Sequence, residues 1–193
     1  MLPLCFRKKN KKKKLTAYHS LQETSNIYWF EKFGLVFCSR KKSSSFPSNM
    51  VEERCIDLAF CVDETGSMGS YIDQVKEHII SIISDTLQDP AVDSLRVGLV
   101  GYRDHPPQDT TFVTQVMEFT EDIAEIKAAV NGMKADGGGD KPECMTDGLY
   151  EVVRLRWRPR AAKVLVLIAD APPHGVGEWS DGFPEGIVLL ISI

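Results

Sequence analysis

The chain alternates short apolar runs with longer segments in which apolar residues recur every three or four positions. From residue 55 onward the apolar runs cover 56–62, 95–102 and 163–169, and a run of mixed polarity covers 111–119. Short runs that are apolar throughout are typical of strands buried on both faces of a parallel sheet, whereas a mixed run is typical of a sheet edge. The pattern therefore predicts four strands.

The segments between these runs have the spacing of helices. They predict one helix over 68–87, a second from 120–123 to about 133, and a third from 142 through 155. Strands that alternate with helices predict an α/β fold. We expect three layers of the Rossmann-like kind, in which helices cover both faces of a mostly parallel sheet.

Length and composition fit one globular domain that follows a basic segment. The 193 residues are 43% hydrophobic and 26% charged, which is enough apolar material for one core. Residues 1–50 contain 11 Lys or Arg and 2 acidic residues, whereas residues 51–193 contain 12 and 25. We expect residues 1–50 to be a basic, mostly unstructured arm, 51–186 to be the folded domain, and 187–193 to be an apolar tail of atypical sequence.

Cysteines and charges in the chain favour a cytoplasmic protein. The five cysteines show neither paired spacing nor a Cys-x-x-Cys motif, which is typical of a reducing compartment. The Lys8–Lys14 run interrupts the apolar segment that a secretory signal would need. An extracellular location is the alternative if the first residues are not those of the natural chain.

The same basic run bears on possible partners. We interpret it as a solvated tail, with contact to an acidic membrane as the alternative and no specific binding of nucleic acid. No apolar segment near the start approaches the ~20 residues of a membrane-spanning helix. We therefore expect no transmembrane segment.

Oxygen-bearing side chains follow the ends of the predicted strands. Asp63 ends the first strand in the pattern Asp-x-Thr-x-Ser, which adds Thr65 and Ser67. Asp170 ends the last strand, and Asp140 lies on a glycine-rich corner that can lean over the same edge. Ligands of such sheets bind at the carboxyl ends of the strands. Hard oxygens suit Mg²⁺, Mn²⁺ or Ca²⁺, so the sequence predicts a divalent-cation site at this edge.

These motifs resemble the von Willebrand factor type A domain, whose metal-ion-dependent adhesion site uses an Asp-x-Ser/Thr-x-Ser loop. The resemblance covers roughly residues 55–186 and rests on three separated stretches, 63–72, 137–143 and 168–174. They are similar to the branch found in alpha-kinase-associated and hemicentin-like proteins. The resemblance implies a divalent-cation-dependent protein-binding module that is not an enzyme.

The resemblance also implies a role for each residue at the strand ends. Asp63 would hold the ion mainly through water, and Thr65 would support it. Ser67 would be a direct hydroxyl ligand, and Asp170 would be the acid of the third loop. A protein partner would complete the metal shell with an acidic side chain.

The second loop departs from the family pattern. Many members supply a threonine ligand from this loop, whereas here Asp140 is the natural substitute, with Glu143 and Thr146 as alternatives. An additional carboxylate would neutralise part of the ion's positive charge. We therefore expect a weaker dependence on an acidic ligand than in the usual site.

The motifs of several enzyme classes are missing from the sequence. A phosphotransfer site of the Asp-x-Asp type would need an acid at Thr65, and no glycine-rich phosphate loop or nucleophile elbow follows a strand. Two alternatives to the binding module are left. The chain is either a regulatory fragment of an alpha-kinase-like protein or a nonfunctional truncated isoform.

The sequence predicts an incomplete sheet. A domain of this family has about six strands, and four are recognisable, so we expect the C-terminal edge of the sheet to be unfinished. The strand over 164–169 would then present an unpaired apolar edge. Such an edge predicts a marginal or insoluble product.

Polar and aromatic residues outside the predicted site receive mainly structural interpretations. We expect Glu64 to face solvent and His174 to stabilise its loop. Asp104 fits either an outer metal shell or a turn before two prolines. Trp157 and Trp179 are predicted to be packing anchors.

Overall fold

The computed structural model describes residues 34–39 and 54–184, with side chains from residue 54 onward. Most of the predicted arm and the predicted tail 187–193 lie outside these ranges. No helix in the described ranges is long and apolar enough to cross a membrane. The elements are β1 (Gly34–Ser39), β2 (Cys55–Asp63), the 3-10 helix η1 (Gly66–Ser70), α1 (Ile72–Gln88), β3 (Ser94–Tyr102), β4 (Thr114–Thr120), α2 (Ile123–Gly132), α3 (Met145–Arg154) and β5 (Ala162–Ala169).

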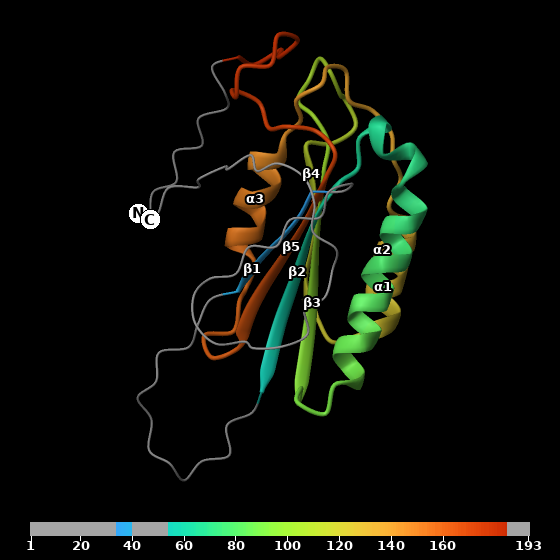
Figure 1. The fold of residues 1–193 in the computed structure, drawn as a ribbon, viewed down its shortest axis with the longest axis vertical. Coiled ribbons are helices and arrows are strands. Elements are labelled where there is room, and N and C mark those ends of the chain that lie inside the picture. Colours follow the sequence, from blue (N-terminus) through green and yellow to red (C-terminus); the bar gives the residue numbers. More distant parts are fainter. Residues whose placement is uncertain (1–33, 40–53, 185–193) are drawn as a thin grey trace, which may run out of the picture.

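The strands form one sheet in the order β1-β5-β2-β3-β4. β2 runs parallel to both β3 and β5, whereas the outer strands β1 and β4 run antiparallel to their neighbours. The carboxyl ends of β2, β3 and β5 therefore meet at one edge, at the top of Figure 1. The predicted α/β fold is confirmed, and the four predicted strands correspond to β2, β3, β4 and β5.

Helices cover both faces of the sheet, α1 and α2 on one side and α3 on the other (Figure 1). Each face has its own apolar core. Phe60 and Val62 of β2 belong to the core under α1 and α2, while Cys61 between them belongs to the core under α3. Because alternate residues of a strand point to opposite faces, residues 58–62 of β2 are all apolar.

The outer edge of β5 is paired, contrary to the prediction. β1 lies within the segment that was expected to be an unstructured arm, and it pairs antiparallel with β5 from Gly34–Ala169 to Ser39–Val164. The backbone of β1 supplies hydrogen-bonding partners for the outer edge of β5. The predicted unpaired edge of β5 is therefore wrong, and β1 is the outer strand on this side of the sheet. The marginal or insoluble product stays a prediction.

Local contacts explain where two helices begin. The carboxylate of Asp122 accepts hydrogen bonds from the backbone N–H groups of Ala124 and Glu125, at 2.8 and 3.3 Å, and so caps α2. α3 begins at Met145, later than predicted. The residues before it are held by neighbouring loops: the N–H of Glu143 donates to the carbonyl of Pro172 and that of Cys144 to Arg103.

A buried ion-pair network fixes the amino-terminal half of β2. Asp57 is fully buried, and its carboxylate accepts hydrogen bonds from the guanidinium groups of Arg96 and Arg158, each with a shortest contact of 2.8 Å. Burial alone would raise the pKa of Asp57, but these hydrogen bonds outweigh it and hold the pKa below its usual value. The network joins β2 to β3 and to the turn before β5.

Candidate metal centre

Asp63 ends β2 and directs its carboxylate toward the loop that follows. Its Oδ1 accepts a hydrogen bond from the backbone N–H of Thr65 at 2.9 Å and another from the Thr65 hydroxyl at 2.6 Å. The hydroxyl oxygens of Thr65 and Ser67 lie 3.2 Å apart. The Asp-x-Thr-x-Ser pattern therefore gathers its three oxygen-bearing side chains in one turn.

Asp170 closes this arrangement from the neighbouring strand. It directly follows β5, and its Oδ1 accepts a hydrogen bond from the Ser67 hydroxyl at 2.9 Å. Because β2 and β5 are adjacent and parallel, the two loops meet at the same edge of the sheet. One line of oxygen contacts thus joins four of the five predicted site residues: Asp63, Thr65, Ser67 and Asp170.

Glu143 brings a further carboxylate to this line of oxygen contacts. The residue is 3% exposed. A Cβ atom added at Gly138 would lie 2.9 Å from Glu143 Oε1 and 3.3 Å from Thr65 Cβ, so Glu143 and Thr65 border the same small space. The Oε2 of Glu143 is buried without a hydrogen-bond partner.

Asp140, the favoured second-loop ligand, lies in another group of side chains. Its Oδ2 accepts a hydrogen bond from the backbone N–H of Gly182 at 2.6 Å, and its carboxylate lies near those of Asp104 and Asp181. The structure therefore places Glu143, and not Asp140, next to the Thr65 turn. Spacing along the glycine-rich corner does not determine toward which side of the loop each carboxylate turns. Thr146, the other alternative, is exposed on α3.

The buried acids of the site raise one another's pKa values. Burial raises the pKa of Asp63 from 3.8 to about 6, and the charge of Asp170 adds to this effect against the hydrogen bonds from Thr65. Burial and the charges of Asp63 and Asp104 raise the pKa of Glu143 from 4.5 to about 9. A divalent cation between these groups would favour their ionised forms and reverse both shifts.

The donor atoms fit a hard divalent cation. Mg²⁺ binds six oxygens at about 2.1 Å, which places neighbouring oxygens of its shell about 3 Å apart. The Thr65–Ser67 and Ser67–Asp170 oxygen separations of 3.2 and 2.9 Å have this spacing. The Oδ2 of Asp63 is buried without a hydrogen-bond partner, which is uncommon for a carboxylate unless an ion or water binds it. These residues therefore fit Mg²⁺.

Glu64 supports the first loop from beneath. It is 4% exposed, so the predicted solvent exposure is wrong. Its carboxylate accepts a hydrogen bond from the backbone N–H of Lys134 at 3.2 Å, and its carbonyl accepts one from Arg103 Nε at 3.1 Å. A side chain at Gly101 would collide with the Glu64 carboxylate. The absence of a side chain there leaves the space in which Glu64 is buried.

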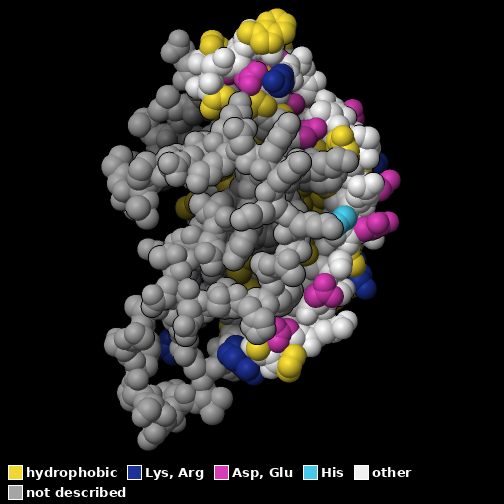
Figure 2. All heavy atoms as spheres, in the orientation of Figure 1, with side chains coloured by type: hydrophobic (Ala, Val, Ile, Leu, Met, Phe, Trp, Pro, Cys, Tyr) yellow, Lys and Arg dark blue, Asp and Glu magenta, His cyan; other side chains and the backbone are white. Residues whose placement is uncertain are grey.

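The two tryptophans have different environments. Trp157 packs edge-on against Phe119 with 4.6 Å between ring centroids, and its indole N–H donates to the carbonyl of Val152, as expected for a packing anchor. Trp179 is 93% exposed, so the prediction for this residue is wrong. It lies on the segment that follows β5, at the end of the molecule where Figure 2 shows hydrophobic side chains next to charged ones.

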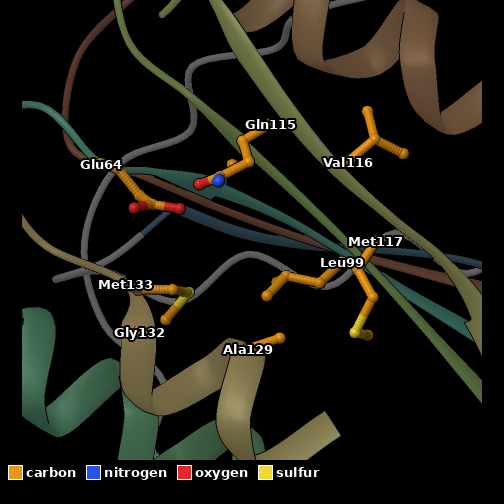
Figure 3. Close-up of a pocket in the computed structure, with 9 residues that line it drawn as sticks. Glu64, Leu99, Gln115, Val116, Met117, Ala129, Gly132 and Met133 are labelled. Carbon is orange, nitrogen blue, oxygen red and sulfur yellow. The ribbon is translucent and has the colours of Figure 1, made fainter. Parts of the chain in front are cut away.

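A small pocket lies between β3, β4 and α2 (Figure 3). Its volume is about 230 Å³, and its lining includes Glu64, Leu99, Met117 and Met133. Small-molecule sites usually occupy about 300–1,000 Å³. None of the residues in the line of oxygen contacts lines the pocket, and we assign the pocket no function.

Sequence reasoning missed two residues near this edge. Tyr102 ends β3, and burial together with the charge of Asp63 raises the pKa of its phenol. Cys144 is the N-cap of α3, and its thiol donates to Asp104 Oδ1 at 3.3 Å. Their positions could have indicated a place near the site. Tyr102 is at the carboxyl end of a strand and Cys144 is at the start of a helix, and both kinds of end lie at this edge of the sheet.

Comparison with known proteins identifies relatives of this sequence. The von Willebrand factor A domain matches residues 57–176. Over 134 residues, 68% of this chain, the sequence is 33% identical to alpha-protein kinase vwkA of Dictyostelium discoideum, covering 21% of that protein. Over 145 residues, 74% of this chain, it is 28% identical to the putative ariadne-like RING finger protein R811 of Acanthamoeba polyphaga mimivirus, covering 14% of it. The chain thus spans about a fifth or less of the length of these relatives.

A solved structure is also similar. The pilus adhesin SpaC from Lactobacillus rhamnosus GG, in its open conformation, matches 62% of this chain and 14% of its own, with 15% sequence identity and a TM-score of 0.41.

Proposed function

Because the chain belongs to the von Willebrand factor A domain family, we propose that it is a divalent-cation-dependent protein-binding module without catalytic activity. Domains of this family generally serve protein interaction. The proposed ion is Mg²⁺, with Mn²⁺ or Ca²⁺ as alternatives, and its ligands come from the loops after β2 and β5.

One observation carries this proposal. The side-chain oxygens of Asp63, Thr65, Ser67 and Asp170 form one line of oxygen contacts across two loops, with neighbouring oxygens 2.6, 3.2 and 2.9 Å apart, and Asp63 Oδ2 is buried beside it without a hydrogen-bond partner. A structural turn alone does not require the buried carboxylate of Asp63 to lie near the exposed carboxylate of Asp170, because their mutual repulsion costs free energy. A bound cation provides the compensating charge.

The proposed partner is a protein that presents an acidic side chain to the ion. Mg²⁺ keeps several positions for water or external oxygens when the protein supplies few ligands, and a partner carboxylate would fill one of them. The exposed Trp179 and Val176 lie on the segment after Asp170, with 93% and 55% of their surfaces accessible. We propose that they contribute apolar contacts to the same partner.

Calorimetric titration of the full chain with Mg²⁺, Mn²⁺ and Ca²⁺ tests the ion. We expect Asp63→Ala to lower the affinity for Mg²⁺ at least about tenfold, because it removes the carboxylate that organises the Thr65 turn. Asp140→Ala is the matched control, since it removes a partly buried carboxylate from the other group. Equal Mg²⁺ binding by wild type and Asp63→Ala would exclude the proposed site.

A second candidate is a regulatory segment of an alpha-kinase-like protein. The 33% identity to alpha-protein kinase vwkA favours it, because the match covers 21% of that protein and leaves room for other domains. Sequencing the natural transcript beyond residue 186 distinguishes the two candidates. If the chain binds no divalent cation, the remaining alternative of a nonfunctional isoform is favoured.

A further inference from the structure

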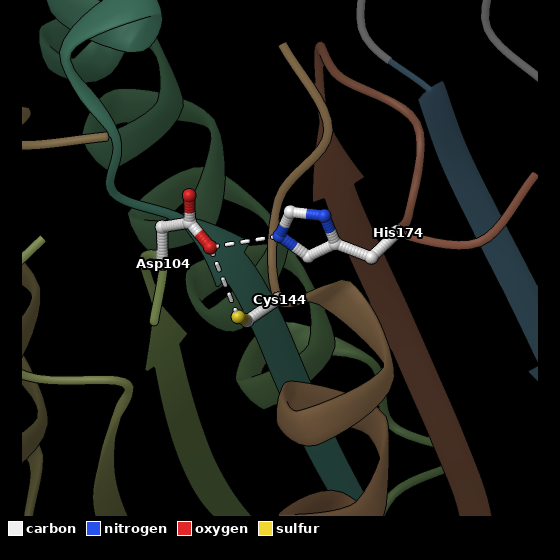
Figure 4. Close-up of side chains that lie close together, drawn as sticks. All are labelled: Asp104, Cys144 and His174. Atoms are coloured by element: carbon white, nitrogen blue, oxygen red, sulfur yellow. Dashed lines mark hydrogen bonds and ion pairs between the residues drawn. The ribbon is translucent and has the colours of Figure 1, made fainter. Parts of the chain in front are cut away.

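We propose that Asp104, Cys144 and His174 form a second metal site, suited to Zn²⁺, at the same edge of the sheet (Figure 4). The three residues come from separate parts of the chain. Asp104 follows β3, Cys144 is the N-cap of α3, and His174 lies on the segment after β5. The site shares no ligand with the line of oxygen contacts from Asp63 to Asp170.

The distances between the three side chains are close to those in a zinc site. Asp104 Oδ1 lies 2.8 Å from His174 Nε2 and 3.3 Å from Cys144 Sγ, and the three ligand atoms lie within 4.8 Å of one another. Zinc binds nitrogen and oxygen at about 2.0 Å and sulfur at about 2.3 Å, so tetrahedral ligands are about 3.3–3.5 Å apart. The Cys144–Asp104 separation already has this size, and the Asp104–His174 separation would lengthen by about half an ångström to admit the ion.

The histidine is oriented as a metal ligand. Its Nδ1 lies 2.7 Å from Asp181 Oδ1, and the Asp181 carboxylate is itself fixed by hydrogen bonds from the backbone N–H groups of Gly175 and Phe183, at 2.7 and 2.8 Å. A metal-binding histidine usually donates its other ring N–H to a carboxylate in this manner. His174 therefore has its Nε2 directed at Asp104 by a prearranged support.

Unpartnered buried oxygens indicate a place where a cation can bind. Asp104 Oδ2 and Asp140 Oδ1 are buried without hydrogen-bond partners. In residues 54–184, the ion pairs of Asp104 and Asp181 are both with His174, so one imidazole faces several carboxylates. The carboxylate of Asp140 lies within 4.8 Å of the ligand atoms of His174 and Asp181. Asp140 therefore borders the proposed site.

The chemical types of the donors select the ion. A thiol and an imidazole beside a carboxylate suit Zn²⁺, whereas Mg²⁺ and Ca²⁺ prefer sites made of oxygen alone. Without metal, burial and the charge of Asp104 raise the pKa of the Cys144 thiol, which keeps its proton. Zn²⁺ would displace that proton and the one between His174 and Asp104.

A neighbouring group competes for the same cysteine. His105 and Asp147 also approach Cys144, and His105 Nε2 lies 3.4 Å from Asp147 Oδ2. Both are partly exposed, whereas Asp104 and His174 are buried. Because Asp104 and His174 are the more buried pair and lie closer together, at 2.8 Å, we assign the ion to them, and His105 provides a matched control.

Cobalt substitution tests the assignment in the full chain. With excess Mg²⁺ present, one equivalent of Co²⁺ is expected to give the near-ultraviolet absorption of a cobalt–thiolate bond, and Zn²⁺ is expected to abolish it. Cys144→Ser and His174→Gln should lose this absorption. Cys55→Ser at the opposite end of β2, His105→Gln and Asp63→Ala should keep it, the last because the Mg²⁺ site is separate.

Two results would overturn the proposal. The first is a cobalt–thiolate absorption of undiminished intensity in Cys144→Ser, and the second is its loss in His105→Gln with retention in His174→Gln. If circular dichroism shows that either ligand variant fails to fold, Asp181→Asn is the deciding variant. It keeps the shape of the side chain next to His174 Nδ1 and removes its charge. We expect it to weaken Zn²⁺ binding about 10–100-fold, and an unchanged affinity refutes the site.

Discussion

Asp63→Asn is expected to stabilise the metal-free protein while it removes Mg²⁺ binding. The amide keeps an Oδ1 that accepts the hydrogen bonds now made by the N–H and hydroxyl of Thr65. It lacks the negative charge that burial and Asp170 make unfavourable. The substitution thus separates the cost of the charge from the geometry of the turn.

The size of the effect follows from the pKa of Asp63, which rises from 3.8 to about 6 on folding. Each pKa unit corresponds to about 1.4 kcal/mol, so ionised Asp63 lowers the free energy of unfolding by about 3 kcal/mol. Between these two pKa values the folded state holds more protons than the unfolded state, and stability falls as pH rises. Above pH 6 the full loss is present.

Urea unfolding with EDTA, followed by tryptophan fluorescence, measures this difference. We expect Asp63→Asn to exceed wild type by about 3 kcal/mol at pH 7.5 and by about 1 kcal/mol at pH 4.5. Adding Mg²⁺ at 100 times its dissociation constant should raise wild type by about 2.7 kcal/mol and leave the variant unchanged. A difference that is absent at pH 7.5, or the same at both pH values, would refute the reasoning.

Three further predictions concern other parts of the molecule. Asp57→Ala should lower the free energy of unfolding by about 3 kcal/mol, because it removes the buried carboxylate that two partly buried arginines share. In the same urea titration Asp93→Ala, which breaks an exposed pair with Arg54, should cost less than about 1 kcal/mol. At pH 7.5 Mg²⁺ binding should release about one proton from Glu143, whose pKa is about 9 without metal; calorimetry in buffers of different ionisation enthalpy should show this release in wild type and its loss in Glu143→Gln. Prolines at positions 36 and 37 should remove at least one β1–β5 hydrogen bond, because successive N–H groups of a strand point to opposite sides; light scattering should then detect oligomers, and a monomeric double variant would contradict this expectation.

Much of the fold follows from periodicity in the sequence. The strands β2, β3 and β5 are mainly apolar on both faces because helices cover both faces of the sheet. Their near-continuous apolar runs therefore indicate central strands of a parallel sheet. The carboxyl ends of parallel strands meet by geometry, so the approach of Asp63 to Asp170 was predictable. The pairing of β1 was not, since a short apolar run far from the domain carries no signal of its partner.

The second loop shows why the rest of the candidate site was harder to predict. Asp140 and Glu143 are three residues apart on a glycine-rich corner, and both have carboxylates that suit a cation. Gly137 and Gly138 adopt positive φ angles of 70° and 74°, which glycine tolerates and most residues do not. These turns send the two carboxylates to different groups, and sequence spacing does not contain that information.

The antiparallel pairing of β1 with β5 gives the protein an order of assembly during synthesis. Among the strands that the structure describes, β1 is translated first and its partner β5 last. β1 therefore stays unpaired while β2, β3 and β4 are synthesised, and it can pair with β5 only after β5 emerges from the ribosome. Contacts between residues so distant in sequence form slowly, so the nascent chain passes through an intermediate in which β5 has one partner. Chaperones that shield strand edges would act on that intermediate.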